Sequence, residues 1–336
     1  MNDRFTLEAT YFKNNIDGLI LNAPQSPSKG IPGNTILQNV GSMYNQGIEL
    51  GLTGSILEKG KFKWNANLNY TYVKNEVTAL AQGNADIAGV TQLETTSITR
   101  VGFPVGSINA VKTAGVNPDN GRRIFVNKAG QMVQYQHINP AGQSRWTFME
   151  GSTAPAITLA DAQIQGSAIP TFYGGFNNNF SYGSFDLGLQ ITYTGGNVIY
   201  NGSQAGLRDQ RFWNNEVGVL RRWTTPGQVT DIPRPIFTDN TSNGSAVPID
   251  VNVEKGDFLR LAYASFGYKL PTSLISKAKI SSARIYAGVN NAFIITKYTG
   301  TDPETSANGD SNLAPGIERN SVPQARTFTF GINLGF

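Results

Sequence analysis

Asp302 and Glu304, separated by Pro303, are the carboxylates whose spacing could support acid–base chemistry. A glycosidase needs two carboxylates on either side of one sugar bond, roughly 5–10 Å apart. Pro303 and the nearby Gly300 are more typical of a turn. The segment 301–310 also lacks the regular ligand spacing of a calcium loop. We therefore interpret Asp302-Pro303-Glu304 as loop structure and predict no catalytic or metal site there.

The chain has one histidine, His137, and no cysteine. This excludes a disulfide framework and a zinc site built from Cys or His ligands. A Ser-His-Asp triad would have to use His137, which lies in the polar stretch 134–140 without a nucleophile elbow. No phosphate loop or dinucleotide fingerprint is present. The sequence therefore predicts a protein that is not an enzyme and that binds no cofactor or metal.

Large aromatic residues and arginines occur together in the long polar segments of the chain. Aromatic faces and guanidinium groups suit contacts with sugar rings or peptide groups. Loop packing, or a place in an aromatic belt at a membrane surface, is the alternative interpretation. The candidate ligand-contacting loop residues are Arg145, Trp146, Arg211, Trp213 and Trp223.

The elements that would position these loops are strands, because hydrophobic residues alternate with polar ones over long runs. The clearest runs are 62–72, 185–194 and 328–336. In the last of these the apolar set is Phe328, Phe330, Ile332, Leu334 and Phe336. Less regular runs begin at Phe5, Ile48, Phe172 and Ala283, and a run at 257–270 changes phase, as a bulge near Ala264 would explain.

These runs give about eight strands, several of them as long as the 9–11 residues that a tilted membrane-spanning strand needs. The predicted connections alternate between short and long. Short ones join 57 to 61, 182 to 185 and 270 to 282, whereas 14–43, 75–170, 196–256 and 295–325 are long and rich in Gly, Asn, Pro and Ser. Outer-membrane barrels have short periplasmic turns and long extracellular loops. The predicted fold is therefore an all-β, antiparallel transmembrane barrel.

Composition agrees with this fold class. Charged residues make up 15% of the chain, below the roughly 25% of soluble proteins. The net charge of +4 is small and the basic residues are scattered, so nucleic-acid binding is not expected. No apolar run reaches the roughly 18 residues of a membrane helix. The start, Met1–Thr6, has no signal-peptide core, so we expect that an amino-terminal part is missing.

Short motifs along the whole chain resemble the carboxy-terminal third of the SusC/RagA-type TonB-linked (TonB-dependent) outer-membrane transporters. Their order and spacing carry the resemblance more than any single motif does. They include Asn45-Gln46-Gly47-Ile48-Glu49-Leu50, Val101-Gly102-Phe103-Pro104-Val105-Gly106, Asp257-Phe258-Leu259-Arg260-Leu261, Pro323-Gln324-Ala325-Arg326-Thr327-Phe328 and a loop motif formed by Tyr298, Gly300, Asp302, Pro303 and Glu304.

The resemblance implies more than the residue patterns do. It implies that 1–336 is the carboxy-terminal portion of a plugged barrel of 22 strands, without the plug domain. Such transporters import oligosaccharides or peptides across the outer membrane of Gram-negative, Bacteroidetes-like bacteria. Their partners are outer-membrane lipids, a SusD-like surface lipoprotein and the TonB complex. The terminal strand, 328–336, resembles the signal read by the barrel-assembly machinery.

Two other functions remain open at this level. One is a small passive pore or adhesion barrel, which a closed barrel of eight strands would allow. The other is a secreted β-sandwich that binds glycans through its loop aromatics. The long strands and one-sided loops argue against the sandwich, in which turns are expected every 8–12 residues.

Overall fold

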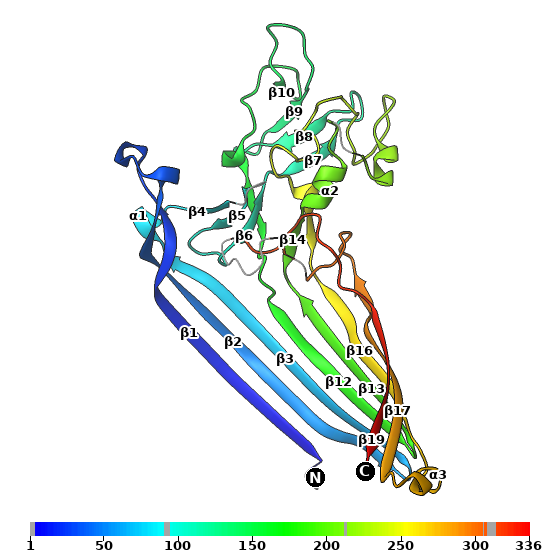
Figure 1. Cartoon of the computed structure of the whole chain (residues 1–336). Helices are drawn as coiled ribbons and strands as arrows, with labels where there is room; N and C mark the ends of the chain where they lie inside the picture. The colour runs from blue at the N-terminus through cyan, green and yellow to red at the C-terminus, as the bar shows by residue number, and fades with distance from the viewer. Residues whose placement is uncertain (1–3, 91–94, 212–213, 305, 308–313) are drawn as a thin grey trace.

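The computed structural model describes residues 4–90, 95–211, 214–304, 306–307 and 314–336. Its main feature is an eight-stranded antiparallel sheet in which consecutive strands pair in chain order (Figure 1). The strands are β1 (Phe5–Pro24), β2 (Thr35–Lys59), β3 (Phe62–Ala79), β12 (Phe172–Tyr182), β13 (Phe185–Gly195), β16 (Phe258–Lys269), β17 (Ser282–Thr296) and β19 (Thr327–Gly335). The eight predicted strands are thereby confirmed, and β1 and β19 form the two edges of an open sheet.

The two faces of this sheet differ in polarity because side chains alternate along a strand. On β19 the apolar residues Phe328, Phe330, Ile332 and Leu334 share one face and are 49–80% exposed. The other face is polar: Asn67 of β3 donates to the Thr53 hydroxyl, and Asn69 accepts from the Gly175 amide. An apolar face of this extent, left uncovered, indicates contact with lipid.

Aromatic side chains mark the limits of the apolar face. Tyr72 pairs with Phe172 at one level, and Phe62 pairs with Tyr182 ten residues further along the strands. Ten residues span roughly 33 Å along a strand and, at a tilt of about 40°, about 25 Å along the membrane normal. This matches the apolar band of an outer-membrane barrel, with aromatic girdles at both interfaces.

The short connections all lie at one end of the sheet, here called the short-turn end. Gly60-Lys61 and Gly183-Ser184 are two-residue turns, with Gly60 and Gly183 at positive φ. The third connection, 270–281, contains α3 (Thr272–Ile275) and the 3-10 helix η6 (Ser276–Ala278). Both termini lie at this end, so the final strand runs away from the long loops (Figure 1).

The long connections gather at the opposite end, the long-loop end, and fold into small sheets and short helices (Figure 1). One sheet has the order β10-β9-β8-β7, one β11-β6-β5-β4, and one β15-β14-β18. Their strands are β4 (Ile87–Val90), β5 (Thr95–Thr99), β6 (Ser107–Ala110), β7 (Thr113–Val116), β8 (Arg123–Val126), β9 (Met132–Tyr135), β10 (Trp146–Phe148), β11 (Gln163–Gly166), β14 (Val198–Asn201), β15 (Val253–Lys255) and β18 (Ile317–Glu318). The helices are α1 (Ala81–Asn84), α2 (Gly202–Leu207), η1 (Pro27–Lys29), η2 (Pro32–Asn34), η3 (Leu159–Asp161), η4 (Val217–Arg221) and η5 (Asp250–Asn252).

Three hydrophobic clusters hold this loop structure together. The largest surrounds Phe125 and Val133 and includes Ile249 from a distant loop. The second surrounds Ile108 and Tyr200, and the third packs Val77 and nearby residues where β3 ends. The loops therefore have water-excluding cores of their own. Among the described residues, no helix is long and apolar enough to cross a membrane.

Two details differ from the sequence prediction. The predicted long connection 14–43 is wrong: β1 and β2 remain paired as far as Pro24 and Thr35, and only the residues between them connect the strands. Asn and Gln interrupt the hydrophobic alternation there, although backbone pairing continues. The bulge in β16 is confirmed, but the register shift lies between Leu261 and Tyr263, slightly before the predicted Ala264.

Candidate functional site

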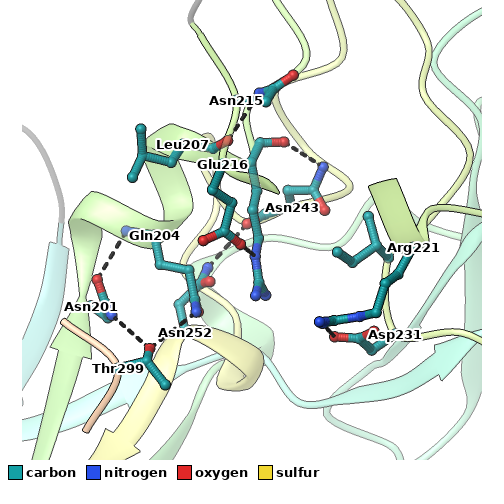
Figure 2. Close-up of polar contacts among 12 residues, drawn as sticks. Asn201, Gln204, Leu207, Asn215, Glu216, Arg221, Asp231, Asn243, Asn252 and Thr299 are labelled. Carbon is teal, nitrogen blue, oxygen red and sulfur yellow. Dashed lines mark hydrogen bonds and ion pairs between the residues drawn. The ribbon is translucent and has the colours of Figure 1, made fainter. Parts of the chain in front are cut away.

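A polar cavity of about 430 Å³ lies in the loop structure, between α2, the 3-10 helix η4 and the segment 299–301. This volume falls within the usual range of ligand sites. Figure 2 shows the side chains around it. Its walls are formed by Asn201, Ser203, Gln204, Leu207, Arg208, Glu216, Gly218, Arg221, Thr299, Gly300 and Thr301.

Asn201 fixes the first wall, because it ends β14 and caps α2. Its side-chain oxygen accepts a hydrogen bond of 2.9 Å from the Gln204 amide, which satisfies one of the free donors at the start of the helix. Its side-chain nitrogen donates to Glu254 Oε1 at 2.9 Å. Asn201 is buried, so both contacts are shielded from water. The cap thereby sets the direction in which Gln204 leaves α2.

Thr299 also lines the cavity, and it is held by the same carboxylate, Glu254. Its amide and its hydroxyl donate to the two oxygens of Glu254 at 2.8 and 2.7 Å. The Gln204 side-chain nitrogen donates in turn to the Thr299 hydroxyl at 3.3 Å. Gln204 Oε1 is inaccessible to solvent and has no donor among the described residues.

The second wall is anchored by an ion pair in which Arg208 Nε lies 2.5 Å from Glu216 Oε1. Asn243 donates to the Arg208 carbonyl, and Asn215 donates to the Leu207 carbonyl. The backbone at Leu207 and Arg208 and the side chain of Arg208 are therefore both held in place. Arg221, further out, pairs with Asp231 at 3.3 Å, and both side chains are exposed.

The chemistry available in the cavity is hydrogen bonding. The walls mix amides, hydroxyls, two arginines that are each paired with a carboxylate, and the single carboxylate Glu216; they contain no imidazole, thiol or pair of carboxylates. Within the described ranges, no cluster of His, Cys, Asp or Glu could hold a metal ion. Such a surface fits a neutral polar ligand with alternating donors and acceptors.

The loop motif predicted from the sequence lies against this cavity. Gly300 lines it, and Tyr298 is buried beside it. Burial raises the pKa of Tyr298, so its hydroxyl stays protonated. Asp302 and Glu304 meet at Arg260 of β16: Arg260 Nη2 donates to Asp302 at 2.7 Å. Arg260 Nε lies 2.9 Å from Glu304 Oε2, at an angle that makes this contact an ion pair without a hydrogen bond.

Arg260 thus ties the loop to the end of a membrane strand. Its side chain and that of Asp302 are almost fully buried, whereas Glu304 is partly exposed. Asp302 also accepts from the Glu304 amide at 3.0 Å, which closes the turn around Pro303. The two carboxylates therefore share one arginine, as a structural anchor would require.

Four of the loop residues singled out in the sequence, Arg145, Trp146, Arg211 and Trp223, are described by the structure and do not line this cavity. Trp146 packs edge-on against Phe125, with ring centroids 5.2 Å apart, in the largest loop core. Arg145 beside it is exposed. Trp223 donates to the Pro118 carbonyl at 2.8 Å, and Arg211 pairs with Asp209. Trp213 lies outside the described residues. A role for any of them in ligand contact stays a prediction.

His137 takes part in a hydrogen-bonded chain and not in a triad. Its Nδ1 lies 3.0 Å from the Tyr135 hydroxyl and its Nε2 2.8 Å from the Thr238 hydroxyl. Thr238 has a φ of 74°, which is rare for a β-branched residue. The chain links the end of β9 to the loop around 238.

The terminal residues lie as the alternation predicts. Phe328, Phe330, Ile332, Leu334 and Phe336 are all exposed on the apolar face of the edge strand or just after it. Their proposed reading by the barrel-assembly machinery stays a prediction. The residues that the sequence missed are Gln204, Arg208 and Glu216. They are single polar residues in a long connection, and only the neighbouring Tyr298-to-Glu304 motif signalled their position.

The fold and site define a class of protein: a membrane β-sheet with a polar inner face and a polar cavity in loops that its strands support. The family described as TonB dependent receptor-like, beta-barrel matches residues 1–292. The match covers most of the chain, and the chain belongs to this family. The predicted recognition and fold class are thereby confirmed.

Named relatives extend over the whole chain. TonB-dependent receptor P3 of Formosa agariphila is 28% identical over 342 residues, which cover 99% of this chain and 32% of that protein. TonB-dependent receptor SusC of Bacteroides thetaiotaomicron is 25% identical over 340 residues, 97% of this chain and 29% of SusC. The chain therefore spans about one third of the length of the curated relatives it matches.

Solved structures show the same fold. The structure of the RagAB peptide transporter superimposes with a TM-score of 0.79 at 24% identity, over 100% of this chain and 34% of that one. The RagAB peptide importer in its open-open state gives a TM-score of 0.75 at 23% identity, over 100% of this chain and 33% of that one.

Proposed function

We propose that this chain supplies part of the barrel wall and of the extracellular loops of a TonB-dependent importer in the outer membrane of a Bacteroidetes-like bacterium. The observation that carries the proposal is a cavity with several polar side chains in its walls, in loops that the membrane strands support. Family membership and the relatives named as TonB-dependent receptors support the same function.

The ligand class is an oligosaccharide or a peptide. Both present alternating hydrogen-bond donors and acceptors, which polar side chains that line the cavity, such as Ser203, Gln204 and Thr301, could meet. A SusD-like surface lipoprotein is the proposed partner that delivers it, since one relative is named SusC and the matched structures contain RagAB. The TonB complex would act through other parts of the transporter, and residues 1–336 would be the carboxy-terminal portion of the barrel.

The test measures energised uptake in cells that express the whole receptor. Fluorescein-labelled starch oligosaccharides and fluorescein-labelled casein peptides are supplied separately, with and without a protonophore. We expect Gln204→Ala to reduce the uptake of one probe about three- to tenfold, as the loss of one hydrogen bond predicts. Gln143→Ala, in an exposed loop outside the cavity, is the matched control and should not change uptake.

Uptake that persists after the proton gradient is dissipated would favour a passive pore and contradict the importer proposal. Equal uptake by cells with and without the receptor, for probes that support growth, would contradict it as well.

A further inference from the structure

An apolar groove of about 530 Å³ runs across β16, β17 and β19 on the lipid-facing side of the sheet. Ala287 forms its floor, because it is paired in register between Phe266 and Phe330, two much larger residues. The next row, Tyr268, Ile285 and Ile332, continues the groove toward the short-turn end. A cavity of about 150 Å³ holds a benzene ring, so this groove has room for a long hydrocarbon segment.

The connection 270–281 lies at the end of the groove and contacts all three of its strands. It joins β16 to β17, and its Ser281 amide donates to the Gly335 carbonyl at the end of β19 at 2.8 Å. Tyr268, next to this connection, packs against Phe185 with ring centroids 4.8 Å apart. This aromatic pair belongs to the girdle at the membrane surface, so the connection lies at the level of lipid headgroups.

The same connection carries two exposed lysines, Lys277 and Lys279, and contains no acidic residue. Neither lysine forms an ion pair within the part of the chain that the structure describes. Lys279 has a φ of 59°, which fixes the direction of the chain as it leaves η6. The neighbouring turn at 60–61 also carries two exposed lysines, Lys59 and Lys61, but its residues do not line this groove.

We propose that this groove and these lysines form a binding site for one anionic phospholipid. An acyl chain occupies the groove over Ala287, and the phosphate group lies between Lys277 and Lys279. The surrounding bilayer is as apolar as the groove, so the selectivity comes from the charged headgroup. The site rests on the proposed placement in the outer membrane and is independent of the ligand cavity at the other end of the sheet.

The test uses the whole receptor, purified in detergent from the outer-membrane fraction, and native mass spectrometry of the lipids it retains. The probes are dioleoylphosphatidylglycerol and dioleoylphosphatidylcholine at equal concentration. We expect the wild-type receptor to retain the anionic lipid about twentyfold better, since each lysine at a membrane surface contributes severalfold. The double variant Lys277→Ala/Lys279→Ala should lose this preference.

Two further variants test the groove and control for the loss of positive charge. Ala287→Leu fills the groove floor and should reduce retention of both lipids, while Lys59→Ala/Lys61→Ala, on the turn without a groove, should leave retention unchanged. Equal retention of both lipids by the wild type, or an equal loss in the Lys59/Lys61 control, would overturn the site. A receptor absent from the outer-membrane fraction would instead contradict the proposed function. Heat-shifted electrophoretic mobility confirms that each variant is folded.

Discussion

Polar side chains occupy different positions in the membrane sheet and in the loop structure at its end. In the sheet they lie on the inner face, and an exception on the apolar face is locally satisfied: Asn178 accepts from Trp64 Nε1 at 3.1 Å. In the loops, charged groups lie deep inside. Arg123 of β8 is 1% exposed and donates to the Ser242 and Asp231 carbonyls.

The difference follows from the surroundings of the two regions, which are lipid for the sheet and water for the loops. A strand facing lipid must keep polar atoms off one face, because an unsatisfied group there costs several kcal/mol. The loops face water, so they need a core of their own, and long connections cannot satisfy their backbone by pairing alone. The buried charge of Arg123 provides two of those missing hydrogen bonds. The sheet is thus specified by a repeating pattern, and the loops by single contacts.

The largest effect should come from removing Arg260, where the two regions meet. Arg260→Met leaves Asp302 buried without its cation, which should destabilise the 297–304 loop by about 3–5 kcal/mol. Hydrogen exchange of that loop in the whole receptor measures this change. Lys297→Met, at a nearby exposed lysine, is the control and should change exchange little. Unchanged protection in Arg260→Met would show that the anchor does not hold the loop.

The second effect tests the polarity of the sheet itself. Leu68→Arg places a charge on the apolar face midway between the aromatic rows, and should cost about 2–4 kcal/mol in a bilayer. Asn67→Arg, on the adjacent residue of the opposite face, should cost under about 1 kcal/mol. Urea unfolding of the receptor in lipid vesicles compares the two. Equal costs would mean that the face assigned to lipid is wrong.

The same comparison explains which features the sequence could predict. The eight strands and the short-turn end followed from alternation, because one periodic rule governs every residue of a lipid-facing strand. The fold of 80–170 and 196–256 did not, since its strands have only three to five residues and its cores join distant segments such as Phe125 and Ile249. Three- to five-residue strands leave no period to detect.

The candidate site divides in the same way. Asp302 and Glu304 were correctly interpreted as loop structure, because Pro303 and Gly300 carry local turn chemistry. Their partner Arg260 belongs to a strand motif about 40 residues earlier, and no local rule connects them. The place of Gln204 and Glu216 in the cavity could not be predicted from the sequence, because it depends on how α2 and η4 pack beside residue 299.

A smaller effect should follow from removing Arg123. Burial lowers the pKa of Arg123 to about 10, so the guanidinium remains charged at neutral pH and depends on the two carbonyls it contacts. Arg123→Met leaves those carbonyls unpaired and should cost about 1.5–3 kcal/mol. Thermal unfolding of the receptor and hydrogen exchange at 231–242 report it. Lys128→Met, on the exposed turn after β8, should lie within about 0.5 kcal/mol of wild type.

The smallest effect is a dependence on pH at Glu304. Burial raises the pKa of Glu304 above the usual value of a glutamate side chain, although Arg260 opposes this shift. The folded loop therefore binds a proton more readily than the unfolded chain, and the stabilising contribution of the neutral carboxyl is fully present below pH 4.5 and lost as pH rises through the folded pKa. Glu304→Gln mimics the neutral form. It should be more stable than wild type at pH 7 by less than about 1 kcal/mol, because the side chain is partly exposed. The urea midpoints of the two proteins are compared at pH 7 and at pH 4.5. We expect the difference between the midpoints to be smaller at pH 4.5. A larger difference at pH 4.5 would mean that the pKa of Glu304 is lowered, not raised, by folding.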